Sequence, residues 1–174
     1  MNLSVRKIVI SGILGAISIL LGVTRLGFIP VPTPAGHATI MHIPAILGGV
    51  LEGPVVGLIT GAIFGIFSWL QPGAPFFADP LVSVFPRLFI GVVAYLVYAA
   101  TKKINSVLAL ILAGAFGSAT NTILVLGMAT WRDYLPAEVS VSIGILHGLP
   151  ELIVAAILTV VLVKGIQRVQ PADK

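Results

Sequence analysis

The chain has 174 residues, of which 57% are hydrophobic and only 9% charged, and its mean hydropathy is +1.11. Soluble domains carry about 25% charged residues, so this composition excludes an ordinary soluble protein and predicts that lipid covers much of the surface. The net charge of +4 is better explained by membrane orientation than by nucleic-acid binding, and the absence of cysteine excludes disulfides, thiolate metal sites and cysteine catalysis.

The first three apolar segments are expected to form helices at 8–23, 38–51 and 54–70. A spanning helix needs about 20 apolar residues, so the second segment is short, and Pro44 interrupts it. A loop rich in proline and glycine, 28–36, precedes it. Gly53 and Pro54 predict a tight turn between the second and third helices, because glycine allows unusual dihedrals and proline suits a first helical turn.

Three further helices are expected at 81–100, 104–129 and 139–163. Asp79 and Pro80 predict the start of the fourth helix, with the Asp79 carboxylate as its N-cap. The expected fold is therefore an all-α integral membrane protein, in which residues 1–174 form a single domain of six transmembrane helices packed as a compact bundle.

Basic residues are distributed unevenly over the ends and connections of these helices. Those on the side that holds both chain ends are Arg6, Lys7, Lys102, Lys103, Lys164, Arg168 and Lys174. Only Arg25 and Arg132 lie on the opposite side. Lysine and arginine accumulate on the cytoplasmic side of membrane proteins, so both termini are predicted to be cytoplasmic.

The three connections on the outer side are long, rich in proline and glycine, and aromatic. Aromatic residues that they carry include Trp69, Phe76, Phe77, Trp131 and Tyr134. Such residues commonly anchor a helix at the membrane interface, and three ordered loops on one face would equally suit a lid over a pocket. The pattern by itself leaves both interpretations open.

Small residues recur on one face of the first expected helix. They are Ser11, Gly15, Ser18 and Gly22, at spacings of four, three and four, with Gly12 and Ala16 beside them. Small residues let a second helix approach closely in lipid. That helix could belong to this chain's own bundle, which is the more common case, or to a separate membrane subunit.

Ionisable and polar residues within the apolar segments form a second pattern. Arg87, Asn121 and His147 lie six to eight residues from the outer ends of their helices, which places each about 9–12 Å below those ends. Glu151 lies about one turn deeper than His147 on the same helix face. Intramembrane ionisable residues are costly and usually functional, so His42 on the second helix joins this candidate set.

This polar layer would suit a polar organic ligand that enters from outside. Arg87 would bind a carboxylate or phosphate, and Asn121, His147 and Glu151 would bind hydroxyl and amide groups. The prolines beside Arg87 and His147 break their helices, and broken helices at this depth often line a cavity. The alternative is an internal Arg87–Glu151 ion pair that only stabilises the bundle.

Catalytic and nucleotide-binding motifs are missing from the sequence. It has no GxxxxGK[ST] loop, no HExxH zinc signature, no GxSxG elbow and no glycine-rich dinucleotide fingerprint. We therefore predict no enzyme, no cofactor and no metal site. A proton-coupled secondary carrier that uses Glu151 and His147 as a relay, or a purely structural bundle, remain as alternatives to a binding protein.

Several runs resemble the substrate-binding S components of energy-coupling factor (ECF) transporters. They are HIPAILGG from His42, EGPVVG from Glu52, GAIFG from Gly61 and DPLVSVFPRLFIG from Asp79. The resemblance covers nearly the whole chain, and the small-residue stripe of the first helix is similar too. It implies a plasma-membrane vitamin-capture subunit whose pocket lies in the outer half of the bundle.

The resemblance also implies partners. S components associate with a transmembrane coupling subunit and two ATP-binding cassette ATPases, and they are thought to deliver the vitamin by toppling in the membrane. The family docks through small residues of the first helix, where this chain has Ser11, Gly12, Gly15 and Ala16. With this resemblance, docking becomes the preferred interpretation of the stripe.

The vitamin itself is suggested by the branch of the family. The chain looks closest to the branch assigned to pantothenate, and Arg87 would suit its carboxylate. Hydroxymethylpyrimidine or a B6 vitamer would instead use Asn121, His147 and Glu151 without an anion site.

Overall fold

A computed structural model describes residues 4–30 and 37–169. Its elements in chain order are α1 (Val5–Val23), β1 (Phe28–Pro30), β2 (His37–Thr39), α2 (Ile43–Glu52), α3 (Pro54–Leu70), the short 3₁₀ helix η1 (Pro75–Ala78), α4 (Pro80–Ser83), α5 (Phe85–Thr101), α6 (Ser106–Trp131), α7 (Ala137–Leu146) and α8 (Gly148–Val169). Residues 31–36 of the expected first loop, and Lys174 of the basic set, lie outside the described residues.

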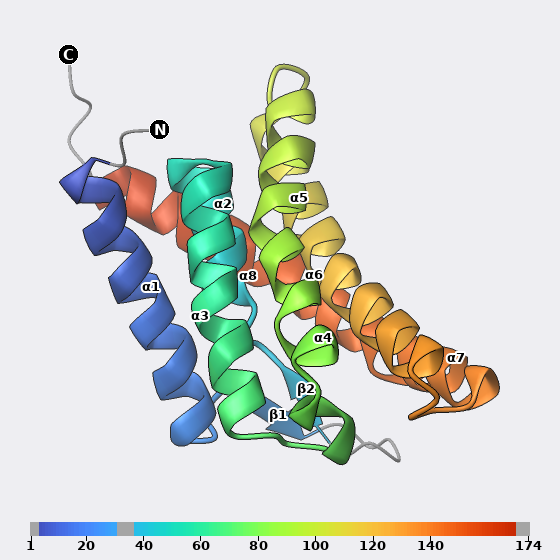
Figure 1. Ribbon diagram of the computed structural model, residues 1–174. Helices are drawn as coiled ribbons and strands as arrows, with labels where there is room; N and C mark the ends of the chain where they lie inside the picture. Colours follow the sequence, from blue (N-terminus) through green and yellow to red (C-terminus); the bar gives the residue numbers. More distant parts are fainter. Residues whose placement is uncertain (1–3, 31–36, 170–174) are drawn as a thin grey trace.

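The helices form six units that run between two ends of a bundle (Figure 1), which confirms the all-α six-helix fold. The units are α1, α2, α3, α4 with α5, α6, and α7 with α8. Four of these, namely α1, α4 with α5, α6, and α7 with α8, are long and apolar enough to cross a membrane, whereas α2 and α3 are shorter apolar helices.

One end of the bundle, which we call the basic end, holds the start of α1 and the close of α8. Arg6 pairs with Glu52 of the α2–α3 turn at 2.9 Å, and Lys164 Nζ donates to Ser106 Oγ at 3.4 Å. The other end, the loop end, holds the β1–β2 ribbon, η1 and the α6–α7 connection (Figure 1). The predicted alternation of short basic turns and long loops is therefore present in the fold.

The second helix begins at Ile43, and the predicted start at residue 38 is wrong. Residues 37–39 instead form strand β2, which pairs antiparallel with β1 so that Phe28 lies opposite Thr39. The start of the helix follows from Pro44, which lacks an amide hydrogen. In the first turn of a helix that amide has no partner anyway, whereas deeper in the helix its absence would remove a hydrogen bond. Residues 43–50 are all buried, so α2 is enclosed by its neighbours rather than by lipid.

Glycines let α2, α3 and α5 pack at backbone contact. A Cβ added to Gly49 would lie 2.1 Å from the Gly91 carbonyl oxygen, and one added to Gly61 would lie 2.1 Å from the Arg87 carbonyl oxygen. No side chain fits at such separations, because real Cβ contacts are longer than 3.0 Å. These contacts fix the start of α5, and with it Arg87, against α3.

The fourth and sixth units are each two helices, where the sequence predicted continuous ones at 81–100 and 139–163. The first break lies at Val84 and the second at His147. Each break is followed within three residues by a proline, Pro86 or Pro150, which cannot donate to the carbonyl four residues earlier. Both interruptions lie beside predicted binding residues.

The other helices lie within three residues of their predicted bounds, except that the last one ends at Val169, six residues beyond the predicted end at 163. Two of the shifted starts follow from capping side chains. Helix α1 begins at Val5 rather than residue 8, with Ser4 as its N-cap. Helix α6 begins at Ser106 rather than 104, because Asn105 Oδ1 accepts from the amides of Val107 at 2.8 Å and Leu108 at 3.1 Å.

Candidate functional site

A cavity of about 380 Å³ opens at the loop end of the bundle. Its walls come from α1, both strands, α3, η1, α5, α6 and both sides of the α7–α8 break. Four of the five predicted binding residues line it: Arg87, Asn121, His147 and Glu151. The tertiary fold thus brings together polar residues that the sequence places up to 64 positions apart, from Arg87 to Glu151.

Arg87 is held in a fixed pose by the break before α5. Pro86 cannot donate to the Val82 carbonyl, and the Arg87 guanidinium fills that place, with Nη1 donating to the Val82 oxygen at 2.6 Å. The guanidinium lies 4.8 Å from the ring centroid of Phe77 and 5.5 Å from that of Phe64. Aromatic contacts of this kind hold a cation without neutralising it.

One donor of Arg87, its Nε, is not used by the described part of the protein. The side chain is 3% exposed, and its Nε is buried with no hydrogen-bond partner among the described residues. A buried, unpartnered donor on a cation is costly unless a ligand satisfies it. The unused Nε of this buried cation therefore points to an anionic ligand group.

Glu151 connects the cavity to the ribbon at the loop end. Its Oε1 accepts from the backbone amide of Thr39 at 2.7 Å, a contact between residues 112 positions apart. Glu151 lies in the first turn of α8, where the helix dipole favours a negative charge. The ion pairs of the described residues are Arg6–Glu52 and Asp79–Arg132, so Arg87 and Glu151 are not directly paired.

Asn121 and Thr122 of α6 add uncharged polar groups to the wall. Asn121 is 6% exposed, and its side-chain oxygen is buried with no hydrogen-bond partner in the described part of the chain. His147 is 7% exposed at the α7–α8 break. Together these side chains could receive hydroxyl and amide groups of a ligand.

His42 differs from the other predicted binding residues because it does not line the cavity. It is fully buried at the start of α2, whereas the preceding residue, Met41, lines the wall. Neither of its ring nitrogens has a hydrogen-bond partner within the described ranges. The sequence placed His42 at membrane depth, but only the rotation of α2 decides that it faces the interior.

The aromatic walls were not predicted as binding residues. They consist of Phe64 and Phe67 of α3 and Phe76 and Phe77 of η1. Phe76 and Phe77 belong to an outer loop for which the sequence left anchors and lid equally open, whereas Phe64 lies in an apolar helix where nothing distinguishes it. Thr39 and Thr122 were missed as well, although Thr122 directly follows Asn121.

The predicted docking set divides between two faces of α1. Ser11 and Gly15 are buried within the bundle, and a Cβ on Gly15 would lie 2.6 Å from Ile63 Cδ1. Gly12 and Ala16 face outward, and nothing lies within 4 Å of a Cβ built on Gly12. The stripe of Ser11, Gly15, Ser18 and Gly22 is therefore used for internal packing, and Gly12 with Ala16 remains available to a partner.

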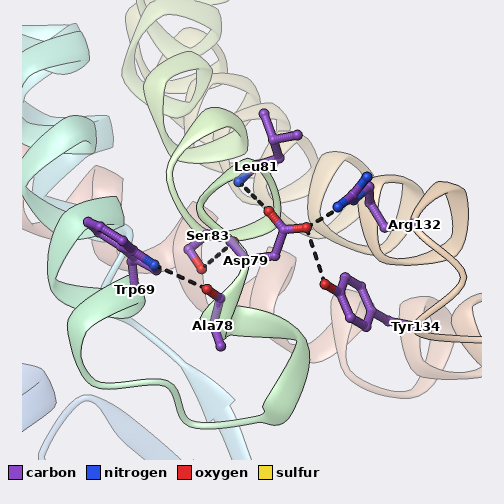
Figure 2. A network of polar contacts seen from close by, with 7 residues as sticks. All are labelled: Trp69, Ala78, Asp79, Leu81, Ser83, Arg132 and Tyr134. Carbon is purple, nitrogen blue, oxygen red and sulfur yellow. Dashed lines mark hydrogen bonds and ion pairs between the residues drawn. The ribbon is translucent and has the colours of Figure 1, made fainter.

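A polar cluster around Asp79 joins two connections at the loop end (Figure 2). Asp79 is the N-cap of α4, as predicted, with Oδ1 accepting from the Leu81 amide at 2.9 Å. Its Oδ2 accepts from Arg132 Nε at 2.9 Å and from the Tyr134 hydroxyl at 3.3 Å. The Leu81 amide first, and then Arg132, lower the pKa of Asp79, so this carboxylate stays ionised at neutral pH.

Comparisons with known proteins agree with this architecture. The family model for the ECF transporter substrate-specific component matches residues 6–163. The pantothenic acid transporter PanT of Lactococcus lactis subsp. cremoris (strain MG1363) is 28% identical over 157 residues, covering 75% of this chain and 78% of that protein. The solved structure of the S component of a bacterial ECF transporter superimposes with a TM-score of 0.67 at 21% identity, covering 94% of this chain and 96% of that one.

Proposed function

The chain belongs to the family of substrate-specific components of ECF transporters, and from this premise we propose that it binds pantothenate in the loop-end cavity. A relative that is named a pantothenic acid transporter supports this vitamin. The chain is thus a multi-pass membrane transport component, and the cell membrane is its proposed location.

The observation that carries the proposal is the incomplete hydrogen bonding of the buried Arg87 guanidinium. Pantothenate has one carboxylate, and the cavity has one buried guanidinium whose Nε lacks a partner in the described structure. Arginine binds carboxylates through two parallel hydrogen bonds, which compensates for removing both charges from water. Hydroxymethylpyrimidine and the alcohol form of vitamin B6 carry no such anion and would leave Arg87 unsatisfied.

The rest of the cavity suits the uncharged part of the same molecule. Pantothenate also has two hydroxyls and one amide, for which Asn121, Thr122, His147 and Glu151 supply donors and acceptors. Its geminal methyl groups would contact the phenylalanine walls. A cavity of about 380 Å³ lies at the small end of the 300–1,000 Å³ range of ligand sites, as expected for a small vitamin.

Transport requires partners, which the proposal takes from the family. A coupling subunit and two ATP-binding cassette ATPases would supply the energy, and the chain would topple in the membrane to carry the cavity from the outside to the cytoplasmic side. Gly12 and Ala16 on the outward face of α1 are the proposed docking residues, because small residues allow close helix contact in lipid.

Isothermal titration calorimetry of the purified chain in nanodiscs tests the ligand. We expect tight binding of pantothenate and no measurable binding of hydroxymethylpyrimidine or pyridoxine at the same concentrations. Tighter binding of either competitor would refute pantothenate as the substrate. Identification by mass spectrometry of a different small molecule that co-purifies with the chain would do the same.

Uptake of labelled pantothenate into proteoliposomes tests the transport role. We expect accumulation only when the coupling subunit, both ATPases and ATP are present. Accumulation by this chain alone, driven by a proton gradient, would instead support the secondary carrier.

A further inference from the structure

The loop-end cluster around Asp79 lies outside the cavity, yet its contacts lead to the cavity wall. Asp79 belongs to the segment between α3 and α4, and Arg132 and Tyr134 belong to the connection between α6 and α7 (Figure 2). One carboxylate thus joins two loops, since Asp79 is 53 positions from Arg132 and 55 positions from Tyr134 in the sequence. The side chain of Asp79 is 8% exposed and that of Arg132 46% exposed, so the pair lies at the rim.

Hydrogen bonds to backbone carbonyls connect the segment that carries Asp79 to the aromatic wall. The Ser83 hydroxyl contacts the carbonyl oxygens of both Phe77 and Asp79, which fixes the turn between η1 and α4. Trp69 Nε1 donates to the Ala78 carbonyl at 3.1 Å and ties the same turn to α3. The turn is therefore held by α3 on one side and by the α6–α7 connection on the other.

The turn carries the ring that contacts the binding cation. Phe77 lies 4.8 Å from the Arg87 guanidinium, and its ring packs against Phe76 with centroids 4.6 Å apart. Helix η1 has only four residues and no hydrophobic core of its own, so external contacts must set its position. A loss of the Asp79 link would leave Phe77, and with it Arg87, less well ordered.

We propose that Asp79 is a positioning residue for the cavity, which acts through Arg132 and Tyr134 to keep Phe77 on the Arg87 guanidinium. The proposal rests on the proposed function, because it takes the cavity as the pantothenate site. Asp79, Arg132 and Tyr134 do not themselves line the cavity. Their contacts lower the entropy that a ligand must otherwise remove on binding, which is the usual benefit of preorganisation.

Two variants break the link from opposite sides. Asp79→Asn keeps a side-chain oxygen for the Leu81 amide but loses the charge that binds Arg132. Arg132→Gln changes a half-exposed side chain outside the cavity, and it keeps the test valid if the Asp79 variant does not fold. The matched control is Glu52→Gln, which removes the Arg6–Glu52 pair at the basic end, an ion pair with the same 2.9 Å separation.

Binding of pantothenate and of pantothenyl alcohol, in which a hydroxymethyl group replaces the carboxylate, is the main measurement. We expect both variants to raise the Kd for pantothenate by about 5- to 20-fold, mainly through faster dissociation, and the Kd for the alcohol by less than about 3-fold. The double variant should be no weaker than the weaker single one, because both remove the same contact. Glu52→Gln should change neither Kd.

Equal weakening of both ligands would overturn the proposal, because it would show a general structural role rather than an effect on Arg87. An unchanged Kd for pantothenate in both variants would overturn it too. Hydrogen exchange of residues 75–84 in the ligand-free chain tests the positioning role separately from the proposed function, because it needs no ligand. Exchange that is faster in both variants but not in the control supports positioning even if wild type binds no pantothenate, and unchanged exchange refutes it.

Discussion

Replacement of Arg87 by glutamine gives the most direct test of the site. The variant keeps a polar side chain of moderate length but removes the charge and the planar pair of donors that a carboxylate needs. Because Arg87 is 3% exposed, its interaction with a bound carboxylate would be almost unscreened by solvent. Each charge-assisted hydrogen bond contributes about 1.5–3 kcal/mol, so the pair contributes about 3–6 kcal/mol. The glutamine amide can still donate one neutral hydrogen bond to the carboxylate, so a net loss of about 3–4 kcal/mol is expected.

That loss corresponds to an increase of on the order of 100- to 1,000-fold in the Kd for pantothenate. Arg87 also donates to the Val82 carbonyl at 2.6 Å, so part of any effect could come from a disturbed break before α5. Pantothenyl alcohol separates the two contributions, since it needs the same cavity but offers no anion.

The assay is a thermodynamic cycle of two proteins and two ligands, measured by calorimetry in nanodiscs. Wild type should prefer pantothenate over the alcohol by at least about 100-fold, and Arg87→Gln should show almost no preference. If the variant weakens both ligands by the same factor, Arg87 acts only on the structure, and the proposed carboxylate contact is wrong.

Three further predictions follow from contacts in the fold. Gly12→Leu should abolish association with the coupling subunit while leaving the Kd for pantothenate unchanged, and loss of ligand binding in this variant would assign the Gly12 face to internal packing. Gly15→Leu should instead lower the thermal stability of the isolated chain, because the leucine side chain would overlap Ile63. Gly91→Ala should destabilise the chain by about 1–3 kcal/mol or more, measured by thermal unfolding, since the new methyl group would lie 2.4 Å from the Gly57 Cα; wild-type stability would show that α3 and α5 can separate freely. Glu151→Ala should speed hydrogen exchange at the Thr39 amide, which loses its acceptor at 2.7 Å, and unchanged exchange would mean that the ribbon is held by other contacts.

Much of the fold was predictable because hydrophobicity and the residues that start or end helices are local properties of the sequence. The apolar segments and the basic residues between them predicted six helices, and Pro54 and Asp79 predicted where two of them start. The hairpin was missed because each of its strands has only three residues, too few to show an alternating pattern. The two strands also lie on opposite sides of a loop.

The candidate site was predictable only in part. Arg87, Asn121, His147 and Glu151 could be assigned to one layer, because rise per residue converts sequence position into depth. Phe64 could not be distinguished, since an apolar residue in a membrane helix can face lipid, core or cavity alike.

The sequence by itself determined that this protein is a bundle of apolar helices with a polar layer near one end, because composition and spacing set depth along each helix. Only the tertiary structure decided which way each helix is turned about its axis. That rotation buries Ser11 and Gly15 inside the bundle, leaves Gly12 outside, and keeps His42 behind the wall. It is set by packing between helices far apart in the chain, chiefly by glycines such as Gly91 that permit backbone contact.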